Sequence, residues 1–140
     1  MILVDLRDKE PPESLPKLGT EDFTLLWHEG FWDGPISGML SYGGQEHWFE
    51  MIQENESTEE GQWYRRYAVV RLTTEQLGRE HKVHEDFRQH VGIHCDYVQD
   101  KRSLQGLRPK DQWHLFYDEH LEYCRSQRFE QAEVIAWFER

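Results

Sequence analysis

Apolar and polar residues alternate along the first half of the chain with the period of two that is typical of β-strands. Phe23–His28 alternates in this way, and Ile36–Tyr42 and Gln45–Gln53 do so on either side of Gly43 and Gly44. Two consecutive glycines tolerate the positive φ angles of a two-residue turn. The pattern therefore predicts a strand followed by a β-hairpin.

Further segments of the first half complete the predicted sheet. Trp63–Leu72, which contains the β-rich run Tyr-Ala-Val-Val, is the next strand, and Ile2–Leu6 is a short edge strand. Lys9–Lys17 contains three prolines, which cannot donate to a ladder, and is interpreted as an extended linker. Asp33-Gly34-Pro35 predicts a turn, and the acidic run Glu54–Gly61 predicts a loop.

The pattern changes to a helical period after residue 72. Thr73 and Gln76 have the spacing of a capping box and predict a helix that runs to about Val91 and ends at Gly92. Ile93–Lys110 shows no regular pattern. Asp111 can cap a second helix, whose apolar stripe recurs at helical spacing and consists of Trp113, Phe116, Tyr117, His120, Leu121 and Cys124.

The order of these elements predicts an α+β fold. We expect an antiparallel sheet of about four to five strands with two main helices packed on one face. Glu133–Phe138 fits a closing strand or a helix equally well. The 140 residues form one domain, 1–140, in which 1–22 is an N-terminal strand and Pro-rich lead-in.

The charge of the chain is unevenly divided. Residues 1–62 hold 14 Asp and Glu against 3 Lys and Arg, whereas residues 63–140 hold 13 of each. An acidic surface repels nucleic acids and membranes and attracts basic proteins. The N-terminus lacks the features of a signal peptide, and no apolar run is long enough to span a membrane, so we expect a cytoplasmic protein.

Large aromatic residues accompany the acids of the N-terminal half. Trp residues dominate the energetics of many protein interfaces, and carboxylates speed encounter with cationic surfaces. The alternative interpretation is that the aromatic residues are core and the acids are solvated. The candidate partner-binding residues are Trp27, Trp32, Asp33, Glu46, Trp48 and Glu50.

No catalytic signature is present, and no cofactor is expected. His81 and His84 are neighbours on one helical turn and could supply two ligands of a metal site, although no zinc signature matches their spacing. Cys95 and Cys124 are too few for a disulfide scaffold. A small metal-dependent enzyme, a nucleic-acid mimic and a homo-oligomer with buried aromatic residues therefore remain as alternatives.

In general character the chain resembles bacterial immunity proteins and antitoxin-type inhibitors. Like them it is small, acidic, rich in Trp and poor in Cys. This resemblance implies a non-enzymatic module that docks on a basic protein and occludes it.

Overall fold

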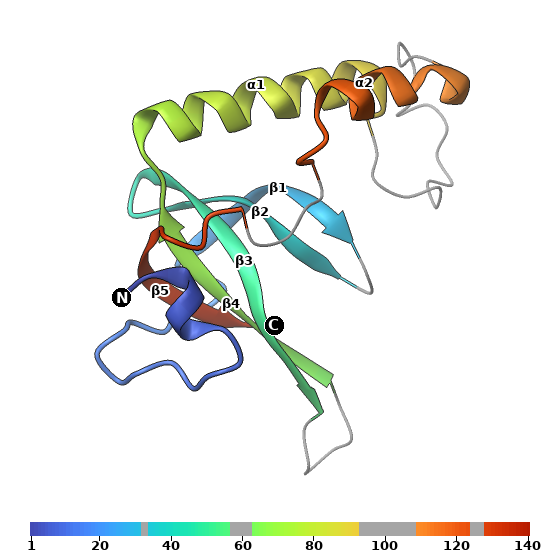
Figure 1. The fold of residues 1–140 in the computed structure, drawn as a ribbon. Coiled ribbons are helices and arrows are strands. Elements are labelled where there is room, and N and C mark those ends of the chain that lie inside the picture. The colour runs from blue at the N-terminus through green and yellow to red at the C-terminus, as the bar shows by residue number, and fades with distance from the viewer. Residues whose placement is uncertain (32–33, 57–62, 93–108, 124–127) are drawn as a thin grey trace.

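The computed structural model describes residues 1–31, 34–56, 63–92, 109–123 and 128–140. They form an α+β fold around one antiparallel sheet whose strands follow each other in sequence order (Figure 1). The hairpin predicted around Gly43 and Gly44 is confirmed, and both glycines have positive φ. The strands are β1 (Phe23–Phe31), β2 (Pro35–Tyr42), β3 (Gln45–Glu56), β4 (Trp63–Arg71) and β5 (Glu133–Glu139).

Both faces of the sheet are buried. One face carries a cluster that includes Met39, Trp48, Val70 and Val134. The other face carries a cluster that includes Leu40, Phe49, Tyr67, Val69, Ala136 and Phe138. Neighbouring residues of one strand enter opposite clusters, as the pleat of a β-strand requires. The C-terminal segment Glu133–Phe138, which fitted a strand or a helix equally well, forms strand β5 and pairs with β4.

The expected edge strand Ile2–Leu6 is wrong, because Leu3–Leu6 forms a 3₁₀ helix, η1. Leu3 and Leu6 are both buried in the first cluster. A strand would point these two side chains to opposite faces, whereas residues three apart lie on the same side of a 3₁₀ helix. Burial of both leucines therefore favours the helix.

One long helix, α1 (Thr74–His90), follows β4 and runs above the strands and past them in the view of Figure 1. Its predicted capping box is confirmed: Gln76 donates its backbone N–H to the Thr73 hydroxyl at 3.1 Å, and the Gln76 side chain accepts from the Thr73 N–H at 2.9 Å. Gly92 follows the helix with φ of 80°, as expected for a helix end.

The second helix, α2 (His114–Glu119), has only six residues and is shorter than the apolar stripe predicted. His120 leaves the helical conformation with φ −125° and ψ 64°, and Leu121 is 75% exposed instead of facing the core. Phe116 and Tyr123 still pack with Phe87 of α1, and the predicted stripe position Cys124 lies outside the described residues. Phe116 and Tyr123 thus reach one core although the helix does not continue from one to the other.

The helices have a core of their own. Val83, Phe87 and Val91 of the α1 segment cluster with Phe116 and Tyr123, separately from the two sheet clusters. Leu77, near the start of α1, packs instead against the first sheet cluster. None of the described helices is long and apolar enough to cross a membrane.

Candidate functional site

The predicted binding residue Trp27 lies on β1 and contacts helix α1. Its ring stacks on His84 with centroids 4.1 Å apart and an interplanar angle of 5°. His81 approaches the same indole edge-on, at 5.0 Å between centroids. Half-buried in this position, Trp27 attaches the helix to the edge of the sheet.

The other described candidates also make contacts within the chain. Glu46 of β3 forms a hydrogen bond with the Nε2 atom of His81. Trp48 is 1% exposed, and its side chain is fixed in the first sheet cluster. Glu50 is 2% exposed and accepts from Arg7 at 2.8 Å. This conformation therefore leaves Trp48 and Glu50 no access to a partner.

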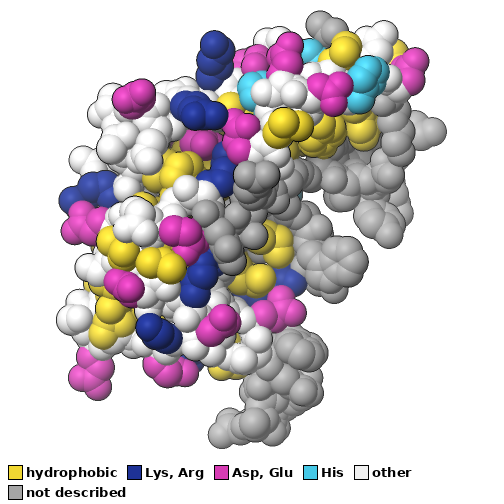
Figure 2. Space-filling model, viewed as in Figure 1, with side chains coloured by type: hydrophobic (Ala, Val, Ile, Leu, Met, Phe, Trp, Pro, Cys, Tyr) yellow, Lys and Arg dark blue, Asp and Glu magenta, His cyan; other side chains and the backbone are white. Residues whose placement is uncertain are grey.

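Trp32 and Asp33 lie outside the described residues, and their part in binding stays a prediction. The four described candidates do not share one exposed patch, because Trp27 and Glu46 both lie against His81 of α1 whereas Trp48 and Glu50 are buried. Figure 2 shows acidic and basic side chains interspersed over the visible face.

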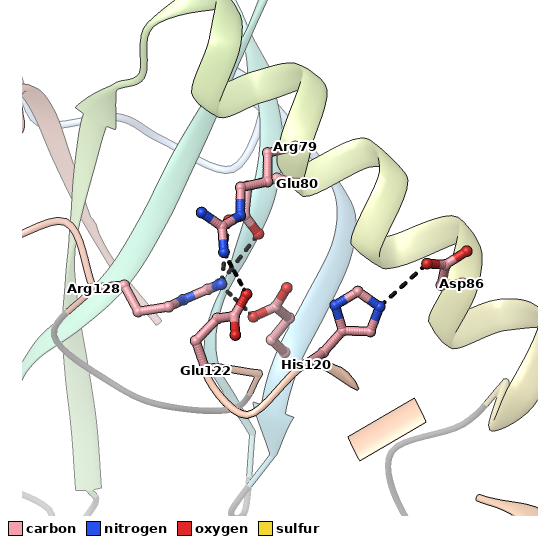
Figure 3. A network of polar contacts seen from close by, with 7 residues as sticks. Arg79, Glu80, Asp86, His120, Glu122 and Arg128 are labelled. Carbon is pink, nitrogen blue, oxygen red and sulfur yellow. Dashed lines mark hydrogen bonds and ion pairs between the residues drawn. The ribbon is translucent and has the colours of Figure 1, made fainter. Parts of the chain in front are cut away.

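A buried polar network joins the sheet to the helices (Figure 3). Arg128, which precedes β5, donates to Glu29 of β1 at 2.6 Å and to both oxygens of Glu80 of α1 at 3.2 Å. Its guanidinium also lies 4.9 Å from the centre of the Trp48 ring, within the range of a cation–π contact. Arg128 therefore connects β1, α1 and the segment that precedes β5, which are far apart in sequence.

The two carboxyl groups of this network compete for one cation. Burial raises the pKa of Glu29 to about 8, the nearby Glu80 adds to this shift, and Arg128 opposes it. Burial also raises the pKa of Glu80. Near neutral pH the pair consequently retains a shared proton, as closely placed carboxyl groups do.

Such a pair can hold and release a proton, but its position does not suit catalysis. The side chains of Glu29 and Glu80 are 1% and 4% exposed. Substrate has no route to them through the described surface. We therefore interpret the network as a structural connection that holds α1 against the sheet. Two further contacts, Arg79–Glu122 and Asp86–His120, join the same helix to the segment after α2.

The two histidines considered as metal ligands are engaged with Trp27 and Glu46 instead. Burial lowers the pKa of His84 to about 4, with a further contribution from Arg88, so its imidazole is neutral. No group of three potential ligands gathers in the part of the chain that the structure describes.

The exposed acids gather in the lead-in segment 5–22 rather than on the strands. All six acids of this segment are exposed, and among the described residues only Glu10 has a basic partner, Arg66 at 2.7 Å. Two of the three bases of the segment are engaged elsewhere: Arg7 with Glu50 and Glu130, and Lys17 with Glu139. The five acids left are Asp5, Asp8, Glu13, Glu21 and Asp22.

Beside this segment lies an aromatic pair that the sequence did not single out. Arg66 approaches the rings of Tyr64 and Trp137 at 5.3 and 5.6 Å, and Lys17 lies 4.9 Å from the centre of the Trp137 ring. The only sequence signal was the alternation of β5, which places Trp137 on the opposite face from Ala136 and Phe138. Trp137 is half-buried and therefore partly accessible.

Comparison with known proteins adds no family: no protein-family model, curated protein or solved structure matches this chain.

Proposed function

We propose that the protein is a non-enzymatic binding module that docks on a basic protein surface. The lead-in segment 5–22 would supply the acidic contact, with Trp137 as the adjoining aromatic anchor. In this proposal the module acts by covering the basic surface of its partner, in the manner of an immunity protein or antitoxin in the cytoplasm. Trp32 and Asp33 remain candidates for the same role.

One observation carries the proposal. Asp5, Asp8, Glu13, Glu21 and Asp22 are exposed and form no ion pair with any described residue, whereas Arg7 and Lys17 of the same segment pair with acids of the rest of the fold. Unpaired carboxylates accelerate association with a cationic surface, and that acceleration falls as salt is added.

The test compares two variants that remove four carboxylates each. The first carries Asp5→Asn, Asp8→Asn, Glu13→Gln and Glu21→Gln; the matched control carries Glu75→Gln, Glu85→Gln, Asp118→Asn and Glu119→Gln, which are exposed positions on or next to the helices. Proteins retained by each form from an extract of the producing cells are quantified, and the best candidate is purified and titrated by calorimetry.

We expect a basic partner that binds the wild type and the control alike but binds the lead-in variant at least about tenfold more weakly, with affinity that falls as salt rises. A partner that binds both variants equally, or whose affinity ignores salt, would show that segment 5–22 is not the docking surface. If no partner is retained, the binding function itself is rejected.

A further inference from the structure

The lead-in segment runs beside β5 and then turns into β1. Leu18 donates to the carbonyl of Trp137 at 2.8 Å, and β1 begins soon afterwards at Phe23. The ring of Phe23 packs on Phe138 of β5 with centroids 4.4 Å apart. The beginning of β1 therefore lies beside the end of β5, although the two strands are the first and the last in the order of the sheet.

A groove lies at this meeting of β1 and β5. Its volume is about 360 Å³, which falls within the range of small-molecule sites. Every residue of its lining belongs to the described part of the chain. The lining consists of Thr20, Phe23, Thr24, Leu25, Glu139 and Arg140.

The groove combines an apolar floor with a few polar groups. Phe23 and Leu25 are alternate residues of β1, are half-buried and pack against the second sheet cluster. Thr20, Thr24 and Arg140 are exposed. A mainly apolar surface with a small number of polar groups is typical of sites that bind small organic molecules.

The charged groups of the lining favour an anion. Glu139 is neutralised within the chain, because it pairs with Lys17 at 3.1 Å and with Arg66 at 2.9 Å. The guanidinium of Arg140 has no acidic partner among the described residues. Its backbone is fixed, since Arg140 and Arg65 exchange two hydrogen bonds of 3.0 Å. Arg140 is therefore an available cation on a well-anchored strand end.

Two acids close by in the sequence do not cancel this charge. Glu21 and Asp22 lie between Thr20 and Phe23, yet neither belongs to the lining. Asp22 accepts from the backbone N–H of Gly19 at 2.7 Å, and the carboxylate of Glu21 also lies against Gly19, 2.5 Å from where a Cβ would stand. Both carboxylates are therefore directed to the turn that precedes the groove.

We propose that this groove binds a small organic anion, a carboxylate with an apolar tail. The tail lies on Phe23 and Leu25, and the carboxylate accepts hydrogen bonds from the guanidinium of Arg140, whose fork of N–H groups matches a carboxylate. The hydroxyl groups of Thr20 and Thr24 can donate to the same anion. An arginine also binds inorganic phosphate, but phosphate makes no use of the apolar floor.

Calorimetric titration of the full chain with four probes tests this chemistry: octanoate, the neutral octanamide, the shorter butanoate and inorganic phosphate. We expect octanoate to bind with a dissociation constant of about 1 mM or lower. Each other probe should bind at least about tenfold more weakly, because octanamide lacks the charge, butanoate has fewer methylene groups to bury and phosphate has no tail.

The variant Arg140→Gln tests the position of the site, and Arg88→Gln, an exposed change on α1, is its matched control. We expect Arg140→Gln to weaken octanoate about tenfold and to leave octanamide nearly unchanged, while Arg88→Gln changes neither. Absence of octanoate binding, equal loss in both variants, or octanamide or phosphate binding as tightly as octanoate would each overturn the proposal.

The groove and the proposed docking surface can be tested separately, because Arg140 is not one of the lead-in acids. The variant that lacks the carboxylates of Asp5, Asp8, Glu13 and Glu21 is expected to bind octanoate as the wild type does, whatever its effect on a basic partner. Loss of octanoate binding in this variant would contradict the assignment to the groove. Circular dichroism confirms that each variant is folded.

Discussion

Glu29 shows how a single buried group can link stability to pH. An isolated Glu ionises near 4.5, whereas the folded environment of Glu29 raises its pKa to about 8. Between these two values the unfolded chain releases a proton that the folded chain keeps. The free energy of unfolding is therefore expected to fall as pH rises from about 5 to 8, by up to about 1.4 kcal/mol per pH unit.

The variant Glu29→Gln removes this proton but keeps the shape of the side chain and its ability to accept from Arg128. We expect the decline in stability between pH 5 and 8 to become shallower in this variant, as measured by urea unfolding at several pH values. Glu85→Gln, an exposed change on α1, is the control. An unaltered pH dependence in Glu29→Gln would mean that Glu29 does not hold the proton.

At the scale of elements, Gly38 and Gly78 differ in the space that the fold leaves for a side chain. A Cβ at Gly38 in β2 would lie 2.1 Å from the Trp27 carbonyl oxygen and 2.7 Å from the His28 Cα, whereas a Cβ at Gly78 in α1 would meet nothing within 4 Å. Gly38→Ala is expected to cost about 3 kcal/mol, because β1 must move away from β2. Gly78→Ala is expected to stabilise the helix by about 0.5–1 kcal/mol.

Chemical denaturation of both variants beside the wild type measures this contrast. If Gly38→Ala is as stable as the wild type, the close approach of β1 to β2 at Gly38 is not present in solution. Gly78→Ala reports independently on α1, since an exposed helical position that gains nothing from alanine would indicate a frayed helix.

Elements with local determinants could be predicted from the sequence. The hairpin depends on Gly43 and Gly44, and the start of α1 depends on Thr73 and Gln76, all of which act on residues close by in the chain. The 3₁₀ helix η1 and the early end of α2 could not be predicted in this way, since distant packing decides them. Leu3 enters a cluster with Trp48 and Val134, which no local pattern reveals.

At the scale of the whole molecule, the candidate site also combines features that the sequence reveals with features that depend on packing between distant segments. The sequence identified Trp27 and Glu46 as candidate partner-binding residues, but their neighbours His84 and His81 come from a helix far along the chain. The surplus of acid in the first half was visible, yet two of its carboxylates, Glu29 and Glu50, are buried against Arg128 and Arg7. A count of charges does not distinguish an exposed carboxylate from one that has a distant buried partner.

Because the helices have a core separate from the sheet clusters, we expect the helices and the sheet to unfold in separate steps. Phe87 is 4% exposed and packs on Phe116 and Tyr123 at ring distances of 5.6 and 5.0 Å, away from both sheet clusters. Phe49 is fully buried between the strands. Each Phe→Ala change removes a core ring and is expected to cost about 3–5 kcal/mol in its own cluster.

Hydrogen exchange distinguishes unfolding of the helical core from unfolding of the sheet. We expect Phe87→Ala to accelerate exchange in the second half of α1 and in α2 while the amides of β2, β3 and β4 stay protected, because Phe87 belongs to the helical cluster and to neither sheet cluster. Phe49→Ala should accelerate exchange throughout the sheet. If Phe87→Ala opens the strands as much as the helices, then the Glu29–Arg128–Glu80 network couples the two cores into a single cooperative unit.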